Sequence, residues 1–467
     1  MAHLPKQAKK LRSVLHVLNK SSRAPLDNIS GLAQVQAAAA SASVGNPGWE
    51  SRTLSRFVER FEDRLLGFEP REAYLALALA CRYPTPALPA SLLGAISQEA
   101  ADAAEEMDNT HLAHVLQLLG TKWREDTALW GIVCEGLSET RVIALPAEAA
   151  ARALQGVAAA LLTREQLEHL ANPLVGALEA RCDDLMLSQV IQVVSVAPAV
   201  GASTLTALLL KRVEGELQEL NTKDLTRALL AASLVDTQRG CAWGGRLGGE
   251  AGEDTVPAPE DGAVALLSVW QQLAGQVAQL VPAFSAGDAV IATHALVHRG
   301  WCEVVPDLLA VASRTPRSSL RPGEEYMLRQ VSLSLELDSD LHAVRDRIAE
   351  DVWDVVSDPE AVGDPGLREV CAKERGWVAA AAETSEQGRL ELDEFYVVDV
   401  AGPGWAVLVE TRPGDAVELA QRRARARHLE LLGNSVGVVR VGWDTEEDAL
   451  RILQHTVRQA RADTLGV

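Results

Sequence analysis

Two acidic residues near the C-terminal end of the chain have types and spacing suited to metal-dependent nuclease chemistry. Asp399 lies inside an apolar run, and Glu410 opens the sequence Glu410-Thr411-Arg412. Some nucleases place an Asp and a Glu-x-Lys on adjacent strands, so that the carboxylates hold Mg²⁺ and the Lys assists. Here Arg412 takes the place of the Lys, and a guanidinium cannot lose its proton to act as a base. We therefore expect no catalysis, and we interpret Asp399 as a residue that fixes a Gly-Pro turn by hydrogen bonds to backbone N–H groups.

The basic segment QRRARARH has the chemistry to bind phosphate. Its arginines are Arg422, Arg423, Arg425 and Arg427. On a helix, Arg423 and Arg427 share one face, while the other two share another. Guanidinium groups suit phosphate contacts and stacking on bases, so all four are candidate RNA-binding residues. The alternative is a solvated helix face on which the arginines pair with Glu418 and Glu430.

Aromatic and histidine residues offer weaker signals. Trp405 and Trp443 are candidates for stacking on RNA bases, although a Trp in a small α/β domain is typically a core residue. His294 and His298 are spaced i, i+4, but they lack the Glu that follows the first His in zinc-protease helices. We interpret this pair, and the pair in HLAH that begins at His111, as structural. We predict neither a metal site nor another cofactor.

Short strands and helices must position these residues. ELDEFYVVDV and WAVLVETR are typical of two strands of a hairpin, with Gly402-Pro403-Gly404 between them. AVELAQRRARARHLELLG predicts a helix that ends at Gly433, and SVGVVRVGW predicts a third strand. EEDALRILQHTVRQARA predicts a closing helix. The order β-β-α-β-α indicates a small α/β domain at residues 386–467.

Upstream of this domain, similar helical phrases recur at a regular spacing. The aligned anchor positions are Leu75, Leu112, Ala150, Leu187 and Leu225, separated by 37, 38, 37 and 38 residues. Val290 and Met327 continue the pattern after a Gly- and acid-rich insertion at residues 243–263. One helix pair cannot bury its apolar face alone, so neighbours must stack. We predict a mainly α chain, with an α-solenoid of about seven 37–38-residue helix-pair repeats at residues 31–340 and capping helices at 341–385.

Polar residues lie near the start of these phrases. Polar pairs such as Asn221-Thr222 and Asp183-Asp184 suit helix N-caps. Thr226-Arg227, Ser188-Gln189 and His111 occupy polar positions near repeat starts, where repeat proteins that read RNA place base-contacting side chains. Their variety fits a base code and ordinary solvent exposure equally well, so both interpretations stay open.

The length, net charge and cysteine content of the chain limit the classes of protein to which it can belong. Its 467 residues include 44 Lys and Arg against 64 Asp and Glu, a net charge of −20, whereas nucleic-acid binders usually carry a basic surface. The six cysteines form no CxxC pair, which favours reduced thiols over a zinc site. No apolar run is long enough for membrane insertion. Residues 1–30 begin with a basic, amphipathic stretch without an acid before Asp27, which predicts an organellar transit peptide or a basic N-terminal helix.

The C-terminal residues resemble the RAP domain, a short module with a restriction-endonuclease-like fold. The resemblance covers residues 393–455 and includes Asp399, Gly402, Pro403, the arginine segment and Gly433, followed by Val438-Val439 and Trp443. It departs from the family where Val400-Ala401 separate the Asp from Gly-Pro, where Gly404-Trp405 replace a His and an aromatic residue, and where Asn434 replaces an aromatic residue.

This family usually carries N-terminal heptatricopeptide- or octotricopeptide-like helical repeats, as in organellar RAP and FAST-kinase-type proteins. The resemblance therefore implies a non-catalytic RNA-binding protein, mitochondrial or alternatively plastid, that acts on mRNA or rRNA in processing, stability, translation or ribosome assembly. A second interpretation is a structural subunit of a large organellar complex such as the mitoribosome, with ribosomal or other assembly proteins as partners. A third and weaker one is a metal-dependent RNA endonuclease. We expect no small-molecule substrate.

Overall fold

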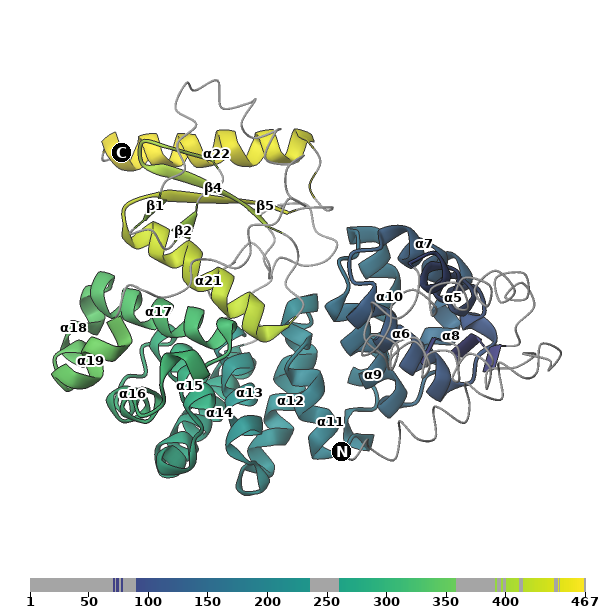
Figure 1. Cartoon of the computed structure of the whole chain (residues 1–467), viewed down its shortest axis with the longest axis horizontal. Helices are drawn as coiled ribbons and strands as arrows, with labels where there is room; N and C mark the ends of the chain where they lie inside the picture. Colours follow the sequence, from purple (N-terminus) through teal and green to yellow (C-terminus); the bar gives the residue numbers. More distant parts are fainter. Residues whose placement is uncertain are drawn as a thin grey trace, which may run out of the picture. The chain divides into compact units, whose positions relative to one another are not determined.

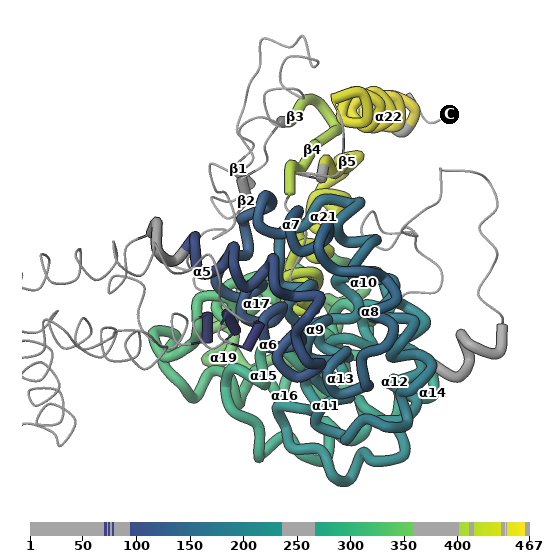
Figure 2. Tube along the Cα trace, turned by 90° about the vertical axis from the view of Figure 1, so that its right-hand side faces the viewer, coloured from purple at the N-terminus to yellow at the C-terminus, as the bar shows by residue number. Residues whose placement is uncertain are grey.

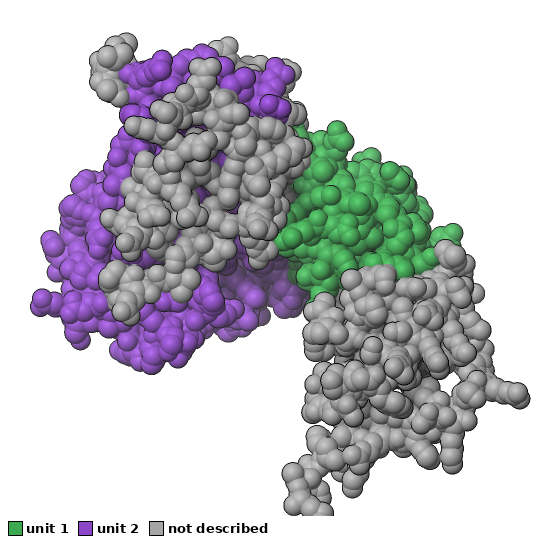
Figure 3. Space-filling view, turned by 45° about the horizontal axis from the view of Figure 1, so that its top comes forward, with its two compact units in different colours: residues 1–177 green, residues 178–467 purple. Residues whose placement is uncertain are grey.

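The fold of this chain is mainly helical, with a small three-stranded mixed sheet late in the sequence (Figure 1). The computed structural model describes residues 70–71, 73–74, 77–78, 90–235, 260–357, 391–392, 396–397, 400–410, 415–440, 444 and 446–465. The predicted transit segment, Asp399, Trp443 and most of the 341–385 segment lie outside these residues. Among the described helices, none is both long and apolar enough to cross a membrane. Two compact units divide the chain, residues 1–177 and residues 178–467 (Figure 3).

Unit 1 contains a series of short helices. They are α5 (Ala90–Asp102), η2 (Ala104–Glu106), α6 (Asn109–Lys122), α7 (Thr127–Gly136), α8 (Glu139–Ile143), α9 (Ala147–Ala159) and most of α10 (Arg164–Glu179). Asp108 caps α6 by accepting from two backbone N–H groups, and the anchors Leu112 and Ala150 are fully buried. Helices α6 and α9 cross with their backbones almost touching. A Cβ on Gly120 would lie 2.0 Å from the Gly156 carbonyl oxygen, and a Cβ on Gly156 would lie 2.1 Å from that of Leu116.

The helices of unit 2 form two rows. The first-row helices are α11 (Leu187–Val194), α13 (Thr222–Leu234), α15 (Ala286–His298) and α17 (Pro322–Leu337), each packed on the next (Figure 1). Behind them lie α12 (Ser203–Gly215), α14 (Glu260–Leu280), α16 (Val305–Ser313) and α19 (Glu350–Ser357). Short connections carry η3 (Cys182–Asp184), η4 (Ala197–Val200), η5 (Leu217–Glu219), η6 (Val281–Ala283), η7 (Arg317–Ser319), η8 (Ser339–Leu341) and α18 (His342–Arg345).

Local sequence signals explain most of these helices, but the structure corrects two of our predictions from the sequence. Asn221 caps α13 as predicted, because its side chain accepts from the Asp224 N–H. The Asp183-Asp184 pair is not a helix cap: it lies in η3, and α11 begins after Met186. The predicted insertion at 243–263 ends too late, because α14 already begins at Glu260.

The C-terminal elements have the predicted hairpin, helix, strand and closing helix, but the predicted first strand at residues 391–400 is wrong: residues 391–392 pair with 396–397, and the hairpin strand begins only at Val400. Strands β3 (Val400–Gly402) and β4 (Trp405–Glu410) form an antiparallel hairpin, and β5 (Ser435–Arg440) joins β4 in parallel. Helix α21 (Ala416–Leu431) connects β4 to β5, and α22 (Glu446–Leu465) closes the chain. A further antiparallel pair is formed by β1 (Glu391–Leu392) and β2 (Tyr396–Val397). The hairpin turns at Pro403-Gly404, where Gly404 has φ 73°, a left-handed conformation that glycine adopts without strain.

The sheet lies between α21 and α22, with α21 on the side of the first-row helices (Figures 1 and 2). Side chains of a strand alternate between the two faces. Trp405, Val407 and Val409 therefore pack with α22, while Ala406 and Leu408 pack with α21. By the same alternation, Glu410 belongs to the α21 face. The α/β elements thus share one compact unit with the helices from residue 178 onward.

Candidate functional site: the arginine helix α21

Helix α21 carries all four candidate arginines and lies against the first-row helices (Figure 1). Asp415 caps it by accepting from the Glu418 N–H at 2.9 Å. The helix ends at Leu431, and Gly433 follows with φ 82°, as the sequence predicts for a glycine that ends a helix. Local sequence signals thus predict the helix and where it ends. The residues that contact it come from distant parts of the chain.

Arg423 and Arg427 point at the C-terminal ends of first-row helices. Arg423 donates to the carbonyl oxygen of Leu234, the last residue of α13, at 2.6 Å. Arg427 donates to the carbonyl of His298, the last residue of α15, at 3.4 Å, and pairs with Asp338, which caps the end of α17. The last carbonyls of a helix lack intrahelical partners and carry its negative pole, so cations are favourable there.

The N-terminus of α21 makes the same kind of contact with a fourth helix. The Ala416 N–H donates at 2.9 Å to the carbonyl oxygen of Ser195, which caps the C-terminal end of α11. One helix therefore reaches the C-terminal ends of α11, α13, α15 and α17 in succession. Sequence reasoning missed this role because nothing local to α21 signals it.

Arg422 and Arg425 face the sheet and pair with Glu410. Their guanidinium nitrogens lie 3.9 and 3.6 Å from its carboxylate, and the Glu410 side chain is only 4% exposed. The carboxylate proposed for nuclease chemistry is thus held between two cations inside the domain. Within the part of the chain that the structure describes, no group of three or more His, Cys, Asp or Glu residues is placed to hold a metal ion.

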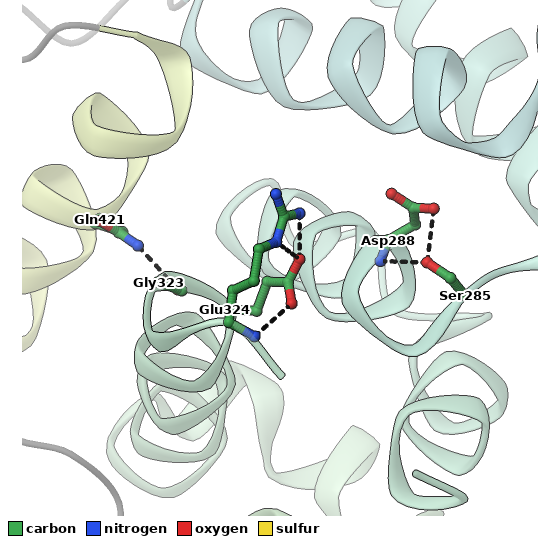
Figure 4. Close-up of polar contacts among 6 residues, drawn as sticks. Ser285, Asp288, Gly323, Glu324 and Gln421 are labelled. Atoms are coloured by element: carbon green, nitrogen blue, oxygen red, sulfur yellow. Dashed lines mark hydrogen bonds and ion pairs between the residues drawn. The ribbon is translucent and has the colours of Figure 1, made fainter. Parts of the chain in front are cut away.

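The amide of Gln421 links α21 to the N-terminal end of α17 (Figure 4). It donates to the Gly323 carbonyl oxygen at 3.0 Å, and the Gln421 carbonyl accepts from Gln330 at 2.8 Å. Beside it, Glu324 accepts from the Arg321 N–H at 2.9 Å and from the Arg321 guanidinium. These contacts fix α21 along α17 as well as at its end.

Three histidines gather where α21 meets α15 and α17. The rings of His294 and His298 lie 4.4 Å apart, with their Nε2 atoms 3.3 Å apart, and His294 Nε2 lies 3.1 Å from the Gln330 side-chain oxygen. His428 Nε2 lies 2.7 Å from the Ser334 hydroxyl. His294 and His428 are completely buried, and His298 is half-buried.

Burial lowers the pKa of each of these histidines. The pKa of His294 falls to about 4, although its hydrogen bond to Gln330 opposes the shift. The pKa of His428 falls to about 3, with additional repulsion from His294 and Arg427. The pKa of His298 is well below its usual value because of burial and then of the neighbouring His294, His428, Arg427 and Arg423. All three imidazoles are neutral at pH 7.

The Ser334–His428 pair has the separation of a catalytic dyad but not its proton arrangement. The Ser334 hydroxyl donates to the Gln330 carbonyl oxygen at 3.0 Å, so its single proton is committed. His428 must then donate from Nε2 to the hydroxyl and cannot act as its base. Ser334 is also 3% exposed. The pair is a packing contact between α17 and α21.

The remaining predicted site residues lie in the hairpin or outside the described residues. Trp405 is 6% exposed and packs between β4 and α22, which is the core position given as the alternative to base stacking. Gly402 faces its ring so closely that a Cβ would lie 2.6 Å from it. Pro403 is exposed at the turn. Asp399 and Trp443 are not among the described residues, so their predicted roles stay predictions.

Unit 1 holds a polar cluster around the HLAH histidines, which we interpreted from the sequence as structural. The ring of Tyr74 stacks on His111 with centroids 4.1 Å apart, and its hydroxyl lies 3.0 Å from His114 Nδ1. Burial, with Arg152 and His111 nearby, lowers the pKa of His114. All four side chains are only half-buried. The HLAH pair is thus the centre of a polar surface rather than part of the core.

Residues of this surface recur at equal places on α6 and α9. His114 and Arg152 both lie two residues after the anchors Leu112 and Ala150. Gln117 and Gln155 both lie five residues after them, and the Gln117 side chain donates to that of Gln155 at 3.0 Å. Comparison of residues at equal offsets from the anchors was the signal that could have found them.

The chain matches no model of a known protein family, and a search of curated proteins found no significant match.

Proposed function

We propose that this protein is a non-catalytic RNA-binding protein whose helix pairs are repeats of an α-solenoid that contacts single-stranded RNA. The observation that carries the proposal is the recurrence of polar side chains at equal offsets on α6 and α9. His114 and Arg152 form one such pair, and Gln117 and Gln155 form another. Repeat proteins that read RNA use two or three side chains at equivalent positions in each repeat.

In unit 2, taken by itself, the offset of two residues also carries polar side chains, whereas at the offset of five α13 has the buried Leu230. Gln189 and Arg227 lie two residues after the anchors Leu187 and Leu225. Gln189 is half-buried and accepts from the Met186 N–H at 2.9 Å, and Arg227 lies 3.5 Å from Asp224. Amide and guanidinium groups in a row can hydrogen-bond to base edges and phosphates. We extend the proposal to this part of the solenoid.

The RAP-like domain has a different role in this proposal. Arg422, Arg423, Arg425 and Arg427 have partners inside unit 2, so RNA phosphates would have to displace Glu410, Asp338 or helix-end carbonyls to reach them. We propose that the docked domain completes the helical array, and that RNA contact by its arginines is secondary. A mitochondrial location, or alternatively a plastid one, rests on the basic N-terminal segment and on the RAP resemblance.

A second candidate is a structural subunit of a large organellar complex such as the mitoribosome. The observation that favours it is electrostatic. The chain has a net charge of −20, and the arginines best suited to phosphate are turned inward. Affinity for nucleic acid depends strongly on cationic contacts with phosphate, so an acidic surface fits protein partners well.

Substitution of the polar pair on α6 and α9 tests the leading proposal. In the variant that combines His114→Ala with Arg152→Gln, we expect the yield of ultraviolet crosslinking to RNA in isolated organelles to fall about tenfold or more. The reason is that loss of one stacking contact alone costs about 1–3 kcal/mol. The control is Arg164→Gln, a half-exposed arginine at the start of α10, which should crosslink like the wild type.

Gradient sedimentation of the same lysates separates the two candidates. Slow-sedimenting protein with a discrete RNA footprint, lost in the double variant, supports the dedicated RNA-binding protein. Co-sedimentation of wild type and double variant with a large particle, with equal crosslinking or none, contradicts it and supports the assembly subunit.

A further inference from the structure

We propose that the docking of α21 on the first-row helices is a pH-sensitive latch. Neutral imidazoles of His294, His298 and His428 hold α21 against α15 and α17, and their protonation releases the helix together with its arginines. This inference does not depend on RNA binding. It rests on the position of three histidines at a contact between segments that are far apart in the chain.

The geometry makes the contact sensitive to added charge. His428 comes from α21, while His294 and His298 come from α15, and Gln330 and Ser334 of α17 lie between them as neutral hydrogen-bond partners. The pair His294–His298 brings two ring nitrogens to 3.3 Å, which requires at least one of them to be unprotonated. Protonation of both would place two cations in contact inside the protein.

The charges around the cluster do not compensate such protonation. From α21, Arg427 and Arg423 add positive charge beside His298 and His428. From α17 and its C-terminal end, Asp338 is the acid that acts on His428, and it already pairs with Arg427. From α13, the contact with α21 is the neutral carbonyl of Leu234. An imidazolium here meets mostly like charge, which is destabilising.

The sign of the pH dependence follows from the lowered pKa values. Undocked histidines titrate near pH 6.5, whereas the docked pKa values are about 4 for His294 and about 3 for His428. The docked state therefore binds fewer protons, so docking is unaffected well above pH 6.5, is already weakened about twofold per histidine at pH 6.5, and weakens further as the pH falls below it. Each histidine weakens docking by up to about tenfold per pH unit until its docked pKa is reached.

Hydrogen exchange of the full chain tests the latch. Protection of residues 416–431 is measured at pH 7.5, 6.5 and 5.5 and corrected for the intrinsic pH dependence of exchange. Because undocked histidines are half protonated at pH 6.5, we expect protection to fall by about sixfold for the three histidines between pH 7.5 and 6.5. Between pH 6.5 and 5.5 we expect a further loss of about fivefold per histidine, up to about 150-fold. Helices α12 and α14, which do not hold the cluster, should keep their protection at pH 5.5.

Two variants assign the effect to the cluster. His428→Gln keeps a donor for Ser334 but cannot gain a proton, so the loss of protection between pH 6.5 and 5.5 should be about fivefold smaller. The control is His455→Gln, an exposed histidine of α22, which should behave like the wild type. If His428→Gln does not fold, His298→Gln serves the same comparison, because His298 is only half-buried.

Three outcomes overturn the latch. The first is a wild-type α21 whose protection is the same at pH 7.5 and 5.5. The second is a loss of protection at one pH and with one slope in α21, α12 and α14 alike, which is acid unfolding of the whole unit. The third is an unchanged slope in a folded His428→Gln or His298→Gln variant.

Discussion

Replacement of Gly156 by alanine is expected to destabilise unit 1 by about 3 kcal/mol or more. The added Cβ would lie 2.1 Å from the Leu116 carbonyl oxygen and 2.6 Å from the Gln117 Cα, and backbone atoms cannot turn aside as a side chain can. Helices α6 and α9 would have to separate and lose the packing around Leu112. Helix propensity alone predicts the opposite sign, because alanine is favoured over glycine by about 1 kcal/mol.

Hydrogen exchange of α6 and α9 in the full chain, followed at increasing denaturant, measures the loss in unit 1. The matched control is Gly94→Ala in α5, where a Cβ would meet nothing within 4 Å. That variant should be as stable as the wild type or up to about 1 kcal/mol more stable. A Gly156→Ala protein as stable as the Gly94→Ala protein would show that α6 and α9 do not cross at this distance.

Neutralisation of Glu410 is expected to cost unit 2 about 3–5 kcal/mol. Glu410→Gln keeps the size of the side chain but leaves Arg422 and Arg425 without the carboxylate between them, and the Arg425 side chain is only 7% exposed. A buried charge that loses its partner keeps its full desolvation penalty. Thermal and denaturant unfolding of the full chain measure the change, and Glu430→Gln on the exposed side of α21 is the control.

The same variant separates a structural role of Glu410 from the nuclease interpretation. A carboxylate that holds Mg²⁺ for catalysis can be neutralised with loss of metal-dependent cleavage and little loss of stability. Neutralisation of a carboxylate that joins two arginines lowers stability and removes no cleavage activity. A fully stable Glu410→Gln protein would contradict the ion-pair role, and loss of an RNA-cleaving activity in it would favour the nuclease.

The C-terminal elements were predictable because their signals are local. The apolar run from Trp405, the turn residues Pro403-Gly404 and the glycine at 433 each act within a few positions, and the structure has the second hairpin strand and the helix that they predict. Gly402, by contrast, belongs to β3 rather than to the turn. The cap at Asn221 was predictable for the same reason. Asp183-Asp184 failed as a cap because a short 3-10 turn satisfies the same preference of acids for helix starts.

The partners of the arginines were not predictable, because they are distant in sequence. Arg423 and Leu234 are 189 residues apart, and no periodicity within α21 refers to the end of α13. The partner of Arg423 is, moreover, a backbone carbonyl. Every residue has one, so the residue type at position 234 does not reveal the contact. Likewise, Gly120 and Gly156 look like costly helix residues until the crossing of α6 and α9 shows why a side chain is excluded.

The reach of α21 along the ends of the first-row helices has a consequence for the nascent chain. Ser195 and Leu234 leave the ribosome long before Ala416 and Arg423, which complete their hydrogen bonds. At about 5–20 residues per second, the 189 residues between Leu234 and Arg423 take roughly 10–40 s to translate. Over that time the C-terminal carbonyls of the growing first-row helices lack the partners that α21 later supplies. A chain whose translation stops before residue 416 lacks these partners, so we expect its first-row helices to be less stable than in the full chain.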